Sequence, residues 1–166
     1  MRLWVVGMMG TGKTTVGRLV AGRVGAQFFD TDELVEQAAN ATIAEIWDRL
    51  GEPGFRAMEA EAILEVSTIP NAVIASGGGA VVHAGNRSVM KSSGLVVWLR
   101  APTQVALDRM PMTVERPLLA GGGVQVLDRI WEERRGLYEE VADHALDTEG
   151  YSPEEVAEST VGLWNR

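Results

Sequence analysis

Short apolar runs alternate with longer amphipathic stretches along the chain. We predict strands from the short runs, because strands covered on both faces are mostly apolar; these lie at residues 2–6, 26–29, 72–76, 95–99 and 143–147. The amphipathic stretches predict helices at residues 14–24, 31–39, 42–50, 54–66, 103–110, 124–142 and 152–165. This alternation predicts an α/β domain with a mainly parallel sheet of five strands.

One domain is expected over residues 1–166, since the sequence shows no internal repeat, linker or low-complexity tract. The one long stretch without clear periodicity lies at about 110–123. It contains two prolines and three consecutive glycines. We expect a mobile loop there.

Composition narrows the classes of partner. The net charge of −8 and the pI near 4.8 disfavour nucleic acid and anionic membranes, which would repel the chain. No apolar run is long enough to cross a bilayer, and we see no signal peptide. The absence of cysteine excludes disulfides, cysteine-ligated zinc and thiol catalysis. We therefore expect a soluble, cytoplasmic protein, in which an anionic ligand would require locally concentrated positive charge.

The stretch GMMGTGKTT at residues 7–15 lies between the first predicted strand and the first predicted helix. It matches G-x-x-x-x-G-K-[ST], a loop whose N–H groups and following helix N-terminus bind phosphate. Lys13 is expected to reach the β and γ phosphates, and the Thr14 hydroxyl to bind Mg²⁺. The residues expected to hold the nucleotide are Gly10, Thr11, Gly12, Lys13, Thr14 and Thr15.

A phosphate-binding loop alone leaves the reaction open. Guanine-specific switches normally carry Asn-Lys-x-Asp, and neither lysine of this chain lies in that setting. Motor ATPases usually have an apolar strand that ends in Asp. Here two of the predicted apolar strands lack that Asp: the strand at 72–76 runs into Ser-Gly-Gly-Gly, and the strand at 95–99 runs into Arg100.

Two carboxylates follow the second predicted strand. Asp30 and Asp32 would lie at the carboxyl edge of the sheet, where α/β proteins bind ligands. One could hold a metal while the other accepts a proton. The same residues also fit an ordinary helix start, because Asp and Thr are common N-caps.

Glycines and arginines supply further candidates. SGGGAV at residues 76–81 is either a flexible turn or backbone that lies close against a ligand. Each arginine alone fits a solvated surface position, but a group of them would hold anions in a chain of this charge. The candidate arginines are Arg56, Arg109, Arg116 and Arg134.

Seven segments resemble, in order and approximate spacing, those of the shikimate kinase family: GMMGTGKTT, FFDTDELVE, GEPGFRAMEAE, SGGGAVV, ERPLLAG, ERRGLYEEVA and ALDTEGYSPEEV. The family phosphorylates the 3-hydroxyl of shikimate with ATP in aromatic amino-acid biosynthesis. The resemblance spans nearly the whole chain. It implies a three-layer αβα sandwich of strand order 2-3-1-4-5, a Mg²⁺ cofactor, a substrate-binding segment at about 31–62, a lid at about 110–123 and a monomer.

The resemblance also implies residue roles. Asp30 would hold Mg²⁺ through water, and Asp32 would contact the substrate hydroxyls as general base. Arg56 and Arg134 would bind the shikimate carboxylate, with Glu59 orienting Arg56. Lys13 and the lid residue Arg116 would stabilise the transferring phosphoryl group. The other substrate positions are Gly77, Gly78, Gly79, Trp47 and Phe55, and the other nucleotide positions are Arg109 and Tyr151.

Some positions depart from the family pattern. Glu149, Gly150 and Tyr151 stand where basic residues are common beside the adenine, although Tyr151 could stack on the base. Trp47 is bulkier than the usual residue, and simple helix packing would also explain it. Two other functions remain open: a related small-molecule kinase, of the gluconate, cyclitol-acid or nucleotide type, and a nucleotide-binding paralogue without catalysis.

Overall fold

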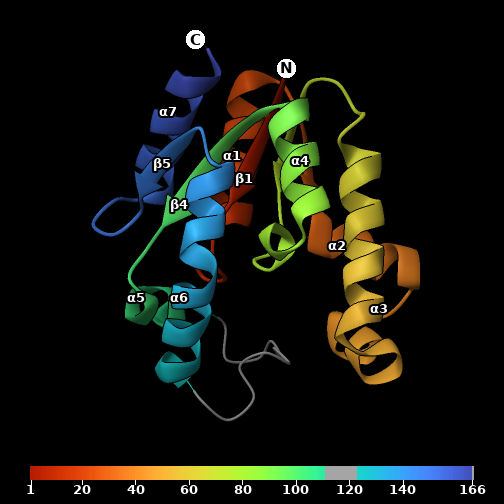
Figure 1. Ribbon diagram of the computed structural model, residues 1–166. Helices are drawn as coiled ribbons and strands as arrows, with labels where there is room; N and C mark the ends of the chain where they lie inside the picture. Colours follow the sequence, from red (N-terminus) through yellow and green to blue (C-terminus); the bar gives the residue numbers. More distant parts are fainter. Residues whose placement is uncertain (111–122, 166) are drawn as a thin grey trace.

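Five parallel strands form one twisted sheet at the centre of the computed structural model (Figure 1). The structure describes residues 1–110 and 123–165. The spatial order is β2-β3-β1-β4-β5. The strands are β1 (Arg2–Val6), β2 (Gln27–Asp30), β3 (Ala72–Ala75), β4 (Leu95–Arg100) and β5 (His144–Asp147). The predicted fold class, strand number and strand order are confirmed.

Helices connect the strands and cover both faces of the sheet. They are α1 (Lys13–Val24), α2 (Thr31–Ala39), α3 (Ile43–Val66), the short 3₁₀ helix η1 (Ala80–Val82), α4 (Ala84–Ser93), α5 (Thr103–Asp108), α6 (Gly123–Val141) and α7 (Pro153–Trp164). No helix in the described part of the chain is both long and apolar enough to span a membrane.

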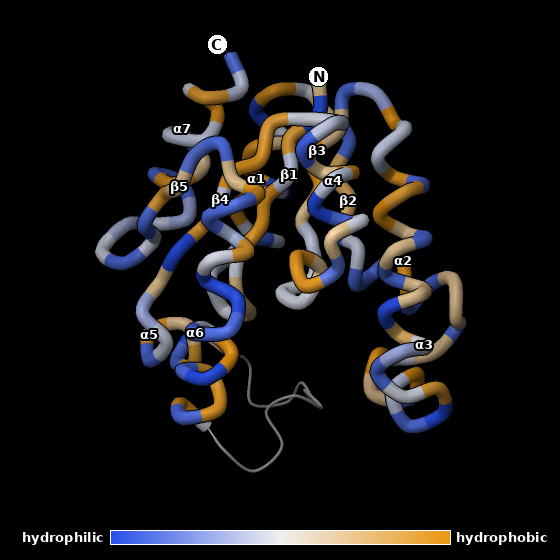
Figure 2. The backbone as a smooth tube through the Cα atoms, in the orientation of Figure 1, coloured by the Kyte–Doolittle hydropathy of each residue, from blue (hydrophilic) through white to orange (hydrophobic). Residues whose placement is uncertain are grey.

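Alternate strand residues build two cores. In β1, Leu3 and Val5 face a cluster with α1 and α7, whereas Trp4 and Val6 face a cluster with α3, α4 and α6. This alternation follows from the two-residue period of a strand. Figure 2 shows the resulting concentration of apolar residues in the central strands. The sheet is therefore the middle of three layers.

Helices α2 and α3 add a smaller apolar cluster of their own. Its buried members are Val35, Ile46, Phe55 and Ala62. The two helices project beside the sheet, beyond α4 in Figure 1. Their side chains therefore approach the carboxyl edge of the sheet from one side.

Two differences separate the predicted helices from the observed ones. The predicted helices at 42–50 and 54–66 form one element, α3, with a kink where Gly51 adopts φ 66° and ψ −178°. Helix α4 was not predicted. Its sequence, AGNRSVMKSS, is rich in Gly, Ser and Asn, which favour helices weakly, so packing against the sheet stabilises it instead.

Parallel pairing brings the functional segments to one edge. Asp30 and Val5 both pair with Ala75, so β1, β2 and β3 end at the same level. The phosphate loop follows β1, and residues 76–79 follow β3. Loops that lie far apart in the sequence thus become neighbours at the carboxyl ends of the strands, as in other α/β proteins.

Ile63→Ala should lower the free energy of unfolding by about 2–5 kcal/mol, because it leaves a cavity in the core beneath α3. Ile63 is 0% exposed, whereas its neighbour Leu64 is 60% exposed. Leu64→Ala should change stability by about 0.5 kcal/mol or less. Urea unfolding of both variants measures the difference, and equal losses would contradict this description of the core.

Candidate active site

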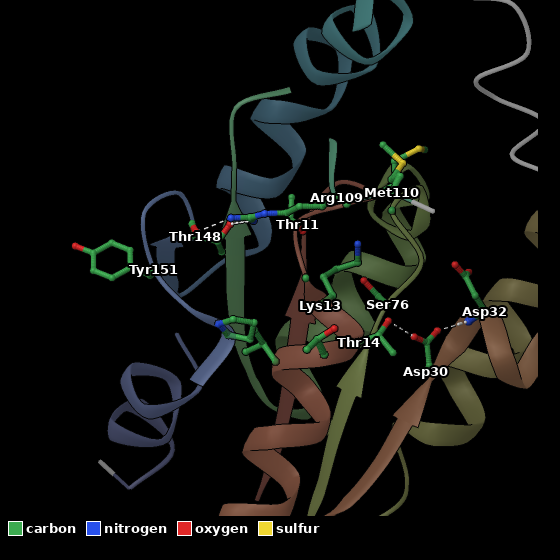
Figure 3. A pocket seen from close by; sticks show the side chains of 17 residues that line it. Thr11, Lys13, Thr14, Asp30, Asp32, Ser76, Arg109, Met110, Thr148 and Tyr151 are labelled. Carbon is green, nitrogen blue, oxygen red and sulfur yellow. Dashed lines mark hydrogen bonds between the residues drawn. The ribbon is translucent and has the colours of Figure 1, made fainter. Parts of the chain in front are cut away.

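A cavity of about 560 Å³ lies at the carboxyl edge of the sheet. Figure 3 shows its lining side chains, with Asp32 at one end and Tyr151 at the other. The wall includes every predicted phosphate-loop residue: Gly10, Thr11, Gly12, Lys13, Thr14 and Thr15. Asp30, Asp32, Gly78, Arg109 and Tyr151 also line it. The cavity therefore joins the predicted nucleotide residues to part of the predicted substrate site.

The phosphate loop has the backbone that a convergent set of N–H groups requires. Gly12, the N-cap of α1, has φ 90°, and Gly10 has φ 77°. A Cβ at Gly10 would overlap the Ala106 carbonyl. Lys13 Nζ donates to the Met8 carbonyl at 2.7 Å. The lysine thus lies across its own loop, at the positive end of α1.

The two predicted metal residues are in direct contact. Thr14 Oγ1 donates to Asp30 Oδ2 at 2.7 Å, while Asp30 Oδ1 accepts the Asp32 N–H at 3.0 Å. Asp30 is therefore the N-cap of α2 as well as the partner of Thr14. The helix-start interpretation of this motif is confirmed, and the metal-binding interpretation stays a prediction that is compatible with it, because the second carboxylate oxygen of Asp30 contacts Thr14.

The donor set fits a hard divalent cation that is also bound by phosphate. Oxygen atoms of Thr14 and Asp30 lie together, and the hydroxyl of Ser76 is buried beside them without a hydrogen-bond partner. Among the described residues, no three His, Asp or Glu side chains are grouped to hold a metal. Mg²⁺ suits such a site, since it is usually held by few protein ligands together with phosphates and water.

Side chains from α2 and α3 occupy the space beside the glycine turn at 77–79. A Cβ at Gly77 would overlap Asp32 Oδ1 and lie 2.7 Å from Glu59 Oε1. A Cβ at Gly79 would overlap the guanidinium of Arg56. Any larger residue at Gly77 or Gly79 would displace these charged groups, so their positions depend on glycine.

The ion pair between Arg56 and Glu59 is largely buried. Arg56 Nη1 donates to Glu59 Oε2 at 2.8 Å, and Glu52 contacts the other edge of the guanidinium at 3.3 Å. Glu59 is 1% exposed, and its Oε1 has no hydrogen-bond partner. Burial raises the pKa of Glu59, and the charges of Arg56 and Arg134 oppose this only in part.

Arg134 approaches the same turn from α6. Its Nη1 donates to the Gly78 carbonyl at 3.2 Å, and the residue is only 7% exposed. In the part of the chain that the structure describes, no carboxylate forms an ion pair with it. A nearly buried guanidinium without a direct ion-pair partner favours an anionic ligand, because an incompletely compensated buried charge is costly.

Arg109 and the loop after β5 form the far end of the cavity. Arg109 Nη1 donates to Thr148 Oγ1 at 2.8 Å, and Arg109 Nη2 donates to the Thr148 carbonyl at 2.9 Å. Tyr151 is 58% exposed, and Pro153 completes this wall. The arrangement leaves an aromatic ring and a flat guanidinium at the end opposite Asp32 (Figure 3).

Other predicted residues lie elsewhere or outside the description. Trp47 and Phe55 pack together, with ring centroids 5.8 Å apart, in the α2–α3 cluster rather than on the cavity wall. Arg116 and most of the predicted lid lie outside the described residues. Sequence reasoning missed Thr148 and the hydroxyl of Ser76, a residue of the predicted SGGGAV stretch. Ser76 ends a predicted strand that reaches the site, so its position was a usable signal.

The strand order, with the phosphate loop (the P-loop, residues 7–15) at the carboxyl end of β1, defines a P-loop kinase fold. The protein-family model of shikimate kinase matches residues 9–163 of the sequence. Curated relatives include shikimate kinase of Thermodesulfovibrio yellowstonii, 40% identical over 98% of this chain and 94% of its own length. Shikimate kinase 2 of Yersinia enterocolitica is 41% identical over 97% and 94%.

The solved structures agree with these relatives. Shikimate kinase from Acinetobacter baumannii, in complex with shikimate, superposes with a TM-score of 0.95 at 36% identity, covering 99% of this chain and 92% of that chain. This chain belongs to the shikimate kinase family.

The free energy of unfolding of the wild type, measured relative to that of Glu59→Gln, should decrease as the pH rises through the folded-state pKa of Glu59. The folded pKa is raised, so protonated Glu59 favours folding at low pH, and this contribution is lost on ionisation. Gln cannot titrate. Urea unfolding across a pH series measures the difference, and a difference that is constant with pH would contradict the burial argument.

Proposed function

We propose that this protein transfers the γ-phosphoryl group of ATP to the 3-hydroxyl of shikimate. One observation carries the proposal: a single cavity runs from the phosphate loop to Asp32 and Gly78, beside two arginines. Family membership supports the same reaction. The bound shikimate of the Acinetobacter baumannii enzyme supports the acceptor.

The nucleotide binds at the P-loop end of the cavity. The N–H groups of residues 10–15 hold the phosphates, and Lys13 moves from the Met8 carbonyl to the β and γ phosphates. The adenine lies against Arg109 and the loop at 148–153, which are hydrogen-bonded to each other, and Tyr151 stacks on it. Arg116 neutralises charge on the transferring group; this role remains a prediction.

Thr14 and Asp30 would hold Mg²⁺, and the unpartnered Ser76 hydroxyl is a further polar group on the same cavity wall. When bound, Mg²⁺ neutralises charge on the phosphates during transfer. Asp30 keeps its hydrogen bond from the Asp32 N–H, so α2 stays anchored at the metal side of the cavity.

The acceptor binds at the glycine turn. Arg56 and Arg134 hold its carboxylate, since two guanidinium groups give directional, charge-assisted hydrogen bonds. Glu59 keeps Arg56 in place from the buried side. The α2–α3 segment, within residues 31–62, thus supplies most of the substrate side, with Trp47 and Phe55 as its apolar support.

Transfer needs alignment and charge neutralisation more than covalent chemistry. Asp32 accepts the proton of the 3-hydroxyl as that oxygen forms its bond to the γ-phosphorus. The bond between the γ-phosphorus and the β–γ bridging oxygen breaks, and ADP leaves with that oxygen. Lys13 and the loop N–H groups stabilise the charge that moves onto ADP.

A coupled assay of ADP release tests the function directly. Purified protein with ATP and Mg²⁺ is measured with shikimate, gluconate, a nucleoside or no acceptor. Turnover that depends on shikimate supports the proposal. Faster turnover with another acceptor would assign a related small-molecule kinase, and ATP binding without turnover on any acceptor would assign a non-catalytic paralogue.

Asp32→Asn should lower kcat by about 10²-fold or more, because an amide cannot accept the hydroxyl proton. ATP affinity should change little. Asp48→Asn, an exposed position on α3, serves as the matched control and should leave kcat unchanged. An unchanged kcat in Asp32→Asn would restrict this residue to the start of α2.

Gly79→Ala should raise the KM for shikimate by about 10-fold and lower stability, while the chain remains folded. The added Cβ overlaps the flexible end of Arg56, which moves away from Glu59 rather than unfolding the chain. Gly22→Ala, where the added Cβ meets no atom within 4 Å, is the control. A shikimate analogue without the carboxylate should not distinguish wild type from Gly79→Ala; if it does, the carboxylate is not the group that Arg56 binds.

A further inference from the structure

Tyr138 on α6 is a fully buried phenol whose hydroxyl donates to the substrate loop. It is 0% exposed, and its hydroxyl lies 2.5 Å from the Gly78 carbonyl, 60 residues away in sequence. A buried tyrosine hydroxyl normally has a hydrogen-bond partner, so the presence of such a bond alone would indicate only ordinary core packing. The choice of acceptor makes the contact informative, because Gly78 lines the cavity.

The Gly78 carbonyl receives two donors from the same helix. Arg134 Nη1 lies 3.2 Å from it, one turn before Tyr138 on α6. A carbonyl oxygen has two lone pairs, so both bonds can form together. Among the described residues, no carboxylate lies within ion-pair distance of Arg134, although its charge acts on Glu59.

Gly78 also packs against the phosphate loop. A Cβ at this position would lie 3.2 Å from the Met9 nitrogen and 3.6 Å from the Gly7 carbonyl oxygen. The main chain of the substrate turn therefore lies directly beside the main chain of the P-loop. A shift of Gly78 would therefore be felt at the P-loop as well as at the substrate turn.

The Tyr138 ring is held by the central sheet. It stacks on Trp98 of β4 with centroids 5.5 Å apart and an interplanar angle of 16°, and Trp98 also contacts Trp131. Strand β4 pairs with β1, which leads into the P-loop. Burial raises the pKa of Tyr138 well above its usual range, so the hydroxyl stays a donor at physiological pH.

We propose that Tyr138 is a positioning residue for phosphoryl transfer: its hydroxyl fixes the Gly78 carbonyl, and thereby sets the substrate turn and Arg134 relative to the P-loop. The proposal rests on the proposed function for its acceptor. Without the hydroxyl, Arg134 alone satisfies the carbonyl and is drawn toward it. Substrate alignment then suffers, whereas the nucleotide site, built on β1 and α1, does not.

Tyr138→Phe tests this with the full-length protein. We expect kcat/KM for shikimate to fall about 10-fold, through both kcat and KM, with the Kd for ATP unchanged. Thr160→Val, which removes another fully buried hydroxyl hydrogen bond in α7, is the matched control and should lower stability alone. Normal kinetic constants in folded Tyr138→Phe would overturn the proposal.

A double-mutant cycle separates positioning from general destabilisation. Tyr138→Phe combined with Arg134→Lys should lose much less than the product of the two single losses in kcat/KM, because both residues act on one carbonyl. Multiplicative losses would overturn the proposal. If Tyr138→Phe does not fold, Trp98→Phe can replace it, because this change loosens the stacking that holds the Tyr138 ring. Trp98→Phe should raise the KM for shikimate. An unchanged KM would count against the proposal.

Inactivity of the wild type on shikimate, by contrast, would refute the proposed acceptor. The Tyr138 proposal would then be measured with whichever acceptor the ADP-release assay identifies.

Discussion

The glycine turn at residues 77–79 is the constraint on which the rest of the site depends. The space that side chains would fill there is taken by Asp32 and Glu59 beside Gly77, by the P-loop backbone beside Gly78, and by Arg56 beside Gly79. These groups come from distant parts of the sequence. A Cβ at Gly77 or Gly79 would therefore displace charged side chains, and a Cβ at Gly78 would press on the P-loop backbone. A phosphoryl-transfer site depends on the precise positions of such groups.

Charge in this region is arranged before any ligand arrives. Glu59 and Arg134 are almost fully buried, and desolvation makes such groups costly. The cost is offset in part by the ion pair of Glu59 with Arg56, which also limits the freedom of that guanidinium. A chain of net charge −8 can then hold a small anion, because the local field of two fixed guanidinium groups outweighs the screened field of distant surface carboxylates.

The parts of the molecule that sequence predicts well depend on local pattern. The five strands and the P-loop follow from apolar periodicity and a short motif, and both appear where expected. The roles of Tyr138 and Thr148 depend on contacts 60 and 39 residues away, with Gly78 and Arg109, that no local pattern encodes. Helix α4 escaped prediction for a related reason, since its weak helix formers are held by tertiary packing.

The two ends of the cavity are built from different elements of the fold. The proposed nucleotide end rests on β1, α1 and the loop after β5, whereas the proposed acceptor end rests on α2, α3 and α6. Side chains on the three acceptor helices can therefore change without disturbing the P-loop, which is how one phosphate-binding scaffold can serve different acceptors. The Gly78 backbone is the point where the two ends touch. Its carbonyl accepts a hydrogen bond from Tyr138 on α6, and a Cβ on its Cα would meet the P-loop backbone, so main-chain packing at this residue links the two ends before any ligand binds.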